Sequence, residues 1–155
     1  MDLIIDASGQ NFCIPYEIRS IKSKADVIKA IQDASRINKK IIMHGTKHSQ
    51  AGQICWEDAI ALDMTGYNKV VNLNVDSKQI TVESGIMWRD ILHAIDPHHL
   101  SLQIMQFVST FSVGGSLSAN IFSRDPRKGR LIELIESFSI ATADQKILRC
   151  SRNEN

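Results

Sequence analysis

The stretch that decides the fold is "SKADVIKAIQDASRINKKIIMHGTKHSQAGQ", residues 23–53. It begins with Ser23, a residue type that caps helix N-termini, and then carries apolar residues at helical spacing: Val27, Ile28, Ile31, Ala34 and Ile37. The apolar run "KIIMH" (40–44) follows, and the extended run "YEIRSIK" (16–22) precedes Ser23. Strand, amphipathic helix and strand predict a βαβ unit.

The end of this stretch, "HGTKHSQAGQ" (44–53), has the position of a ligand-binding loop. It comes directly after the second expected strand, and open α/β sheets usually bind ligands at the carboxyl ends of their strands. Its residue types leave three alternatives. A metal site would use His44 and His48, four positions apart, but Gly45 directly after a strand disfavours the helix that this spacing needs.

A phosphate site would use Gly45, where backbone amides can approach a ligand closely, together with Thr46, Ser49 and the cation Lys47. The third alternative is an ordinary polar turn. For so short a motif taken alone, the ordinary turn is the favoured interpretation. The rest of the chain therefore has to decide between them.

The second part of the chain indicates antiparallel pairing. After the apolar run "AIALDM" (59–64), residues 69–84 alternate around the turn signal Asp76-Ser77 and predict a β-hairpin. Residues 87–95 have helical periodicity, and residues 131–150 contain two β-rich runs around "TADQ". We therefore expect an α+β fold, with a βαβ lobe over 1–53 and a second lobe with a mainly antiparallel sheet over 54–155.

Composition limits the partners that the chain can have. The 155 residues are 43% hydrophobic and 23% charged, with a net charge of +1 and no block of like charge, so no nucleic-acid or membrane-surface footprint is indicated. The start lacks a basic segment before an apolar run, and no window reaches the roughly 18 apolar residues of a membrane span, which favours a cytoplasmic protein. Cys13, Cys55 and Cys150 form no CxxC motif, which argues against a zinc ribbon or a disulfide framework, and we expect no metal.

Several motifs occur together and in order: "HGTKHSQAGQ", "ALDM", "VESGIMWRDIL", "SVGGSLSAN" and "ESFSIATADQKILRCSRNEN". In this order and spacing they resemble the FAD-binding domain of the vanillyl-alcohol oxidase or PCMH-type flavoprotein family, and look most like cytokinin dehydrogenases and sugar-alcohol oxidases. The segment "DASGQNFCIP" (6–15) is similar to the N-terminal entry of that family. The resemblance thus covers nearly the whole chain.

What the resemblance implies is a PCMH-type domain of two α/β lobes that hold FAD. The cofactor-binding residues that it implies are Gly45, Thr46, Lys47, His48, Ser49, Gln53, Ser112, Val113, Gly114, Gly115 and Ser118. The residue types are consistent with such a site. Glycines let the main chain approach a ligand, and Ser112, Ser116 and Ser118 offer neutral hydrogen bonds. In isolation "SVGGS" is equally a helix N-terminus capped by Ser112.

Two residues and the end of the sequence need separate comment. His48 falls on the histidine that in many relatives bonds covalently to the flavin 8α-methyl group, so it is the candidate for covalent attachment. Lys47 stands where the family usually has glycine, which would cost about 1 kcal/mol if φ is positive there. The sequence ends at "CSRNEN", where relatives continue into a substrate domain, and we expect this chain to be part of a longer protein.

We therefore expect the FAD-binding domain of a flavin-dependent oxidoreductase that acts on a C–OH or C–N bond of a small organic substrate. The domain would not be active alone, and a C-terminal substrate domain or a partner chain would complete it. The alternative is a non-catalytic, stand-alone flavin or nucleotide-binding module. No catalytic side chain can be named, since His93, His98 and His99 are expected on the solvated surface; Trp56 and Trp88 are expected in the core or at lobe contacts.

Overall fold

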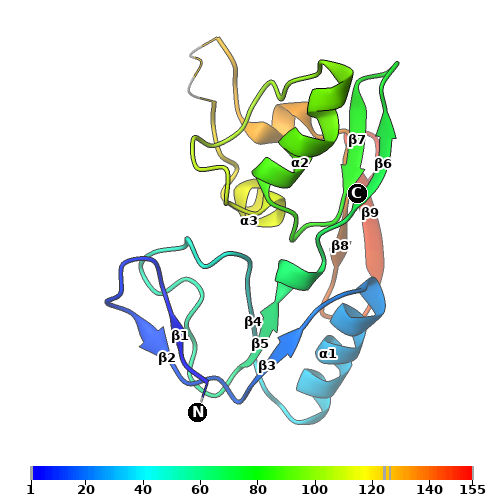
Figure 1. Cartoon of the computed structure of the whole chain (residues 1–155). Coiled ribbons are helices and arrows are strands. Elements are labelled where there is room, and N and C mark those ends of the chain that lie inside the picture. Colours follow the sequence, from blue (N-terminus) through cyan, green and yellow to red (C-terminus); the bar gives the residue numbers. More distant parts are fainter. Residues whose placement is uncertain (1, 124, 126, 155) are drawn as a thin grey trace. The chain divides into compact units, whose positions relative to one another are not determined.

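A computed structural model describes residues 2–123, 125 and 127–154, and these form two compact units. The N-terminal unit comprises Met1–Gly66 together with Glu136–Asn155, and the central unit comprises Tyr67–Ile135. Figure 1 shows the course of the chain through both units. Helices and strands are mixed, which confirms the expected α+β class.

The N-terminal unit is built on a parallel sheet of three strands, β3 (Glu17–Ser20), β4 (Ile41–His44) and β5 (Ile60–Asp63). Their order is β3-β5-β4, and all neighbours are parallel. Helix α1 (Lys24–Arg36) connects β3 to β4 and contacts β5 (Figure 1). The expected strand–helix–strand order is therefore confirmed, with β5 inserted between its two strands.

Helix α1 begins where the sequence predicts. The Ser23 hydroxyl accepts a hydrogen bond from the Asp26 amide at 3.2 Å, and the Asp26 carboxylate accepts one from the Lys22 amide at 3.0 Å. These reciprocal bonds satisfy two backbone amides that have no acceptor within the helix. They also hold the pKa of Asp26 below its ordinary value, the Lys22 amide being the larger cause.

Strand β5 groups with the N-terminal unit, whereas the first lobe was expected to end at residue 53. Ile60, Ala61 and Leu62 are at most 1% exposed. A continuous apolar run of this kind is typical of a parallel strand covered on both faces, so it occupies the centre of the sheet.

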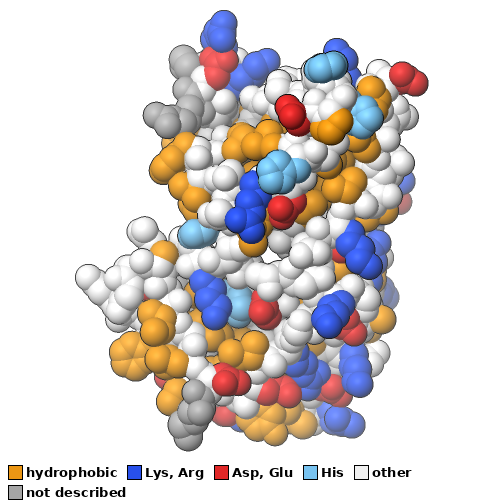
Figure 2. All heavy atoms as spheres, viewed as in Figure 1, with side chains coloured by type: hydrophobic (Ala, Val, Ile, Leu, Met, Phe, Trp, Pro, Cys, Tyr) orange, Lys and Arg blue, Asp and Glu red, His pale blue; other side chains and the backbone are white. Residues whose placement is uncertain are grey.

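A short hairpin opens the N-terminal unit, with β1 (Ile4–Ile5) antiparallel to β2 (Phe12–Cys13). Ile4 and Cys13 form one cross-strand pair and are buried, whereas the neighbouring pair Ile5 and Phe12 is exposed. Figure 2 shows hydrophobic side chains over this part of the surface. The buried pair attaches the hairpin to a small core that includes Ile54 and Ala61.

The central unit contains the hairpin of β6 (Val70–Asn74) and β7 (Gln79–Val82), which confirms the expected turn around Asp76-Ser77. Helices α2 (Trp88–Ile95) and α3 (Val113–Ser118) follow, with 3-10 turns at Asp96–His98 and Leu131–Leu134. Their shared core consists of Ile86, Trp88, Ile91, Ile95, Ile104, Ile121 and Leu131.

The last hairpin pairs β8 (Ser137–Ala141) with β9 (Ile147–Ser151), so the expected antiparallel pairing is confirmed. It groups with the N-terminal unit, however, and not with the second lobe expected from the sequence. The unit to which a hairpin belongs depends on long-range contacts, which its own period-2 pattern does not encode. Across the described residues, no helix has the length and apolar character required to cross a bilayer.

Candidate functional site

The loop 45–53 leaves the sheet at the carboxyl end of β4, where His44 pairs in register with Asp63 of β5. His44 is 4% exposed, and its Nδ1 lies 3.0 Å from the Gly45 carbonyl oxygen. With Nδ1–H donating to that carbonyl, Nε2 is a bare acceptor, and among the described residues it has no hydrogen-bond partner. Residues 45–50 are not helical, so His44 and His48 do not share a helix face.

The first residues of this loop present unused backbone donors. Within the described part of the chain, no acceptor lies within hydrogen-bond distance of the amides of Gly45, Thr46 and Lys47. Gly45 and Thr46 are half-buried, and Lys47 is exposed. Consecutive amides of this kind, with a hydroxyl and an ammonium beside them, are donors that suit an anion.

The backbone of the loop is strained at two residues that carry side chains. Lys47 has φ +57° and Ala51 has φ +56°, while Gly52 has φ +70°. The left-handed conformation costs an L-residue about 1 kcal/mol or more, whereas glycine adopts it freely. The positive φ considered for position 47, where the family usually has glycine, is therefore present.

The segment 112–118 offers much less backbone hydrogen-bonding capacity than the sequence led us to expect. The amides of Val113, Gly114 and Gly115 donate to Ile86 O at 2.9 Å, Ser84 O at 2.7 Å and Ser112 Oγ at 3.4 Å. These contacts hold the start of α3 against the segment that follows β7. Amides that are already bonded in this way are not free donors for a phosphate.

The close approach of Ser84 requires a glycine at position 114. A Cβ at this position would lie 2.9 Å from both Cβ and O of Ser84, closer than real Cβ contacts. Ser112, which caps α3, is buried, as is Ser116, whose Oγ accepts a hydrogen bond from Trp88 Nε1 at 2.9 Å. Ser118 and Gly115 are exposed, whereas Val113 and Gly114 are half-buried.

Sequence reasoning missed Asp6, which binds the loop from the N-terminal hairpin. Its carboxylate accepts a hydrogen bond from the Gly52 amide at 3.0 Å, and the Ala7 amide donates to Ser49 O at 2.9 Å. The available signal was "DAS" (6–8), because an aspartate two residues before a serine often folds back on its own turn.

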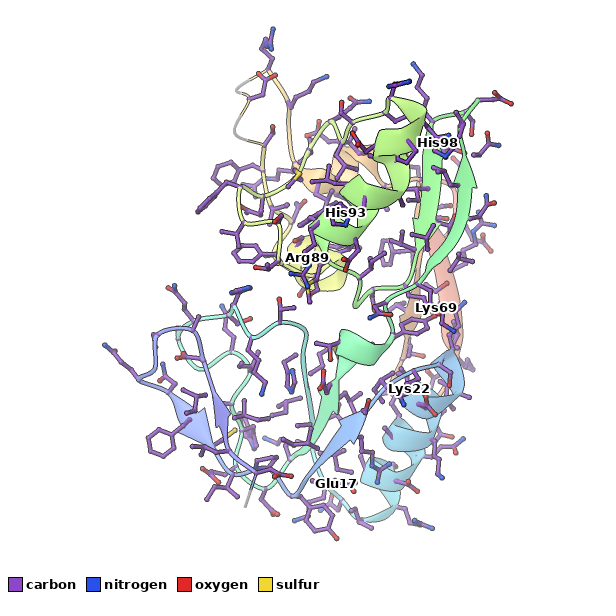
Figure 3. All side chains as sticks on the ribbon, in the orientation of Figure 1. Glu17, Lys22, Lys69, Arg89, His93 and His98 are labelled. Atoms are coloured by element: carbon purple, nitrogen blue, oxygen red, sulfur yellow. The ribbon has the colours of Figure 1, made fainter. Side chains whose placement is uncertain are left out.

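The remaining histidines and Gln53 are exposed. Gln53 and His48 are exposed members of the loop. His93, His98 and His99 are exposed, which confirms the surface interpretation, and Figure 3 shows His93 on α2 and His98 just beyond it. Among the described residues no group of three His, Cys, Asp or Glu side chains could hold a metal ion.

Comparison with known proteins decides the family. Residues 17–151 match the model of the FAD binding domain family. The chain belongs to this family. FAD is accordingly the cofactor of the domain, and the PCMH-type α+β architecture expected from the motifs is confirmed.

Relatives of this FAD-binding domain are larger proteins. L-gulonolactone oxidase of Mus musculus is 29% identical over 143 residues, which is 92% of this chain and 32% of that protein. L-gulono-1,4-lactone dehydrogenase of Mycobacterium tuberculosis is 24% identical, over 95% of this chain and 34% of that protein. The chain therefore spans about a third of the length of these curated relatives.

Among solved structures, the FAD-binding domain is similar in fold to an alkyldihydroxyacetonephosphate synthase. The TM-score is 0.76 at 21% sequence identity, over 86% of this chain and 28% of that structure.

The loop 45–49 fits the diphosphate part of FAD, since its open amides, the Thr46 hydroxyl and the Lys47 ammonium are all donors. In the segment 112–118, the exposed Gly115 and Ser118 are the most accessible to a ligand.

Proposed function

We propose that the loop 45–49 of this FAD-binding domain holds the diphosphate of FAD. The observation that carries the proposal is the row of open amides at Gly45, Thr46 and Lys47. Diphosphate oxygens are strong acceptors, and three adjacent amide donors together with an ammonium would bind them at short range. Ser49, Gln53 and Ser118 would add side-chain contacts to the rest of the cofactor.

We propose further that the domain serves an oxidoreductase that acts on a C–OH bond of a small organic molecule, with a C–N bond as the alternative. Support comes from the names of two relatives, a gulonolactone oxidase and a gulono-1,4-lactone dehydrogenase. Bound FAD would supply the redox chemistry. The substrate pocket would come from the part that those relatives have beyond the matched third, on the same polypeptide or on a partner chain.

His48 is the residue that we propose for covalent attachment of the flavin. It lies next to the open amides and is exposed, so a cofactor anchored on residues 45–47 could be reached by its imidazole. We place the protein in the cytoplasm, because Cys13, Cys55 and Cys150 are free thiols, which fits a reducing compartment.

Calorimetric titration with FAD, FMN and riboflavin tests the diphosphate assignment. We expect FAD to bind at least about tenfold more tightly than riboflavin, which lacks phosphate, and more tightly than FMN, which has one phosphate group. Equal affinity for FAD and riboflavin would show that the flavin ring, and not the diphosphate, carries binding. That result would overturn the role of the loop.

Replacing Lys47 by glycine is expected to raise the free energy of unfolding by about 1 kcal/mol and to preserve FAD binding, because glycine adopts φ +57° without strain. Lys47→Ala is the matched control, since it removes the same charge and keeps the strained Cβ. Urea unfolding should therefore show the gain only for the glycine variant. A loss of FAD affinity beyond about tenfold in both variants would instead make the ammonium an essential ligand.

A further inference from the structure

The carboxylate of Asp6 is buried in the N-terminal hairpin and is fully hydrogen-bonded. It is 4% exposed, and its Oδ1 accepts hydrogen bonds from the Ser8 amide at 3.0 Å and the Ser8 hydroxyl at 2.6 Å. Its Oδ2 accepts from Asn11 Nδ2 at 2.8 Å and from the Gly52 amide at 3.0 Å. The pKa of Asp6 is held well below its usual range, chiefly by the Ser8 hydroxyl and then by the Gly52 amide.

The two carboxylate oxygens serve different parts of the fold. Oδ1 closes the turn of the β1–β2 hairpin on itself, because both of its donors come from Ser8, two residues away. Oδ2 joins that hairpin to the loop 45–53, since Gly52 lies 46 positions further along the chain. Both parts belong to the N-terminal unit.

Other contacts reinforce this junction. The Ala7 amide donates to Ser49 O at 2.9 Å, so the hairpin holds the loop at two points. A Cβ on Gly52 would lie 3.6 Å from Asn11, which places the loop backbone directly against the hairpin. On the loop side, the Gly52 amide donates one of these bonds and the Ser49 carbonyl accepts the other.

The loop has little internal support of its own. Its own backbone hydrogen bonds include Gln53 N to Gln50 O at 3.4 Å and Cys55 N to Gly52 O at 2.9 Å, both near its C-terminal end. Lys47 and Ala51 hold positive φ values that a free chain would avoid. Strained backbone of this kind persists only where the surrounding structure enforces it.

We propose that Asp6 is a positioning residue that fixes the loop 45–53, and with it the amides of Gly45–Lys47, in the conformation that binds the cofactor. The anchoring is read directly from the contacts of Asp6, whereas its consequence for the ligand rests on the proposed function. The competing explanation is that Asp6 stabilises only its own hairpin.

Asp6→Asn separates the two explanations, because an amide can accept on one side only. All four donors now converge on two oxygens, so the NH2 group of asparagine must face a donor wherever it points. Ser8→Ala is the matched variant, since it removes a bond to Oδ1 and leaves the Gly52 bond to Oδ2 intact. Asp76→Asn, an exposed site in the β6–β7 turn, controls for the change of charge.

Hydrogen exchange followed by mass spectrometry on the whole chain without ligand is the primary measurement. For Asp6→Asn we expect exchange of the bonded loop amides of Gly52 and Gln53 to accelerate by tenfold or more. For Ser8→Ala we expect faster exchange in the hairpin and a change of less than about twofold in the loop. Loop exchange that is unchanged in both Asp6→Asn and Asp6→Ala, or equally accelerated in Ser8→Ala, would overturn the proposal.

FAD titration of the same variants supplies the second readout. Asp6→Asn should weaken FAD binding by about tenfold, while Ser8→Ala and Asp76→Asn should remain within about twofold of the natural chain. If the natural chain itself binds no FAD, the proposed function fails, and the exchange data still decide whether Asp6 anchors the loop. Accelerated exchange with unchanged FAD affinity would overturn the cofactor role. Asp6→Ala can be added to remove all four bonds, and the asparagine variant decides if the alanine variant does not fold.

Discussion

Replacing Trp88 by alanine is expected to lower the free energy of unfolding of the Tyr67–Ile135 unit by about 3–5 kcal/mol. Trp88 is 3% exposed and lies in the core of that unit with Ile86, Ile91 and Ile121. Truncation would remove the buried ring and leave a cavity among these side chains, which can fill it only in part.

The same substitution would also remove a hydrogen bond that attaches α3 to α2. Trp88 Nε1 donates to Ser116 Oγ at 2.9 Å, and Ser116 is 3% exposed, so its hydroxyl would lose its partner inside the core. A buried hydroxyl without a partner costs about 1–3 kcal/mol. We therefore expect α3, which carries the exposed Ser118, to be the first element of this unit to lose protection from hydrogen exchange.

Trp56→Ala is the matched control for this prediction. Trp56 is 51% exposed, and its ring is covered on one face by Lys40 Nζ, 3.6 Å from the ring centroid. Loss of such an exposed cation–π contact costs about 0.5–1 kcal/mol. Urea unfolding followed by far-UV circular dichroism should separate the two variants by more than about 2 kcal/mol. Equal effects would show that the core described around Trp88 does not stabilise the unit.

The contrast between the two tryptophans shows how far the sequence could predict the fold. Trp88 lies within a periodic helical run and its burial follows from that pattern, but Trp56 lies in a loop, where no pattern distinguishes a buried ring from an exposed one. Trp56 is therefore not in the core, where it could have been expected. Local sequence signals predicted the structure correctly where they depend only on neighbouring residues. Examples are the Ser23 cap of α1 and the turn at Asp76-Ser77.

Features that depend on contacts with distant segments could not be predicted from the sequence. The central place of β5 depends on which strands cover it, and the grouping of β8 and β9 with the N-terminal unit depends on contacts across about a hundred residues. The same holds within the candidate site. One of the two alternatives for the motif at 112–115 was the start of a helix, and the structure has that helix. Only the structure shows that its amides already donate to Ser84, Ile86 and Ser112.

The second prediction concerns a covalent bond between His48 and the flavin, which is either present or absent. If its imidazole bonds to the flavin 8α-methyl carbon, flavin fluorescence should remain on the polypeptide after the chain is reconstituted with FAD in air and then fully denatured. The new N–C bond replaces one hydrogen of the methyl group. The attachment would remove two hydrogens in total, with dioxygen as the oxidant, so the intact protein should gain the mass of FAD less two hydrogens.

A loop anchored on the diphosphate is what makes this reaction feasible for a surface histidine. The open amides of Thr46 and Lys47 immediately precede His48, so binding of the cofactor there would hold the imidazole near it instead of leaving the two to meet by diffusion. A neutral imidazole is required, since the protonated ring has no free lone pair for attack. Anchoring and attachment would thus be two effects of the same segment.

His48→Ala should abolish the retained fluorescence and the added mass while weakening reversible FAD binding by less than about tenfold, because the diphosphate donors remain. His93→Ala, on the exposed face of α2, is the control that removes an imidazole outside the loop, and it should retain the flavin as the natural chain does. Lys47→Gly should retain it too, since it leaves His48 in place. Complete release of flavin from a natural chain that had bound FAD would rule out the bond and leave His48 as a polar contact of the loop.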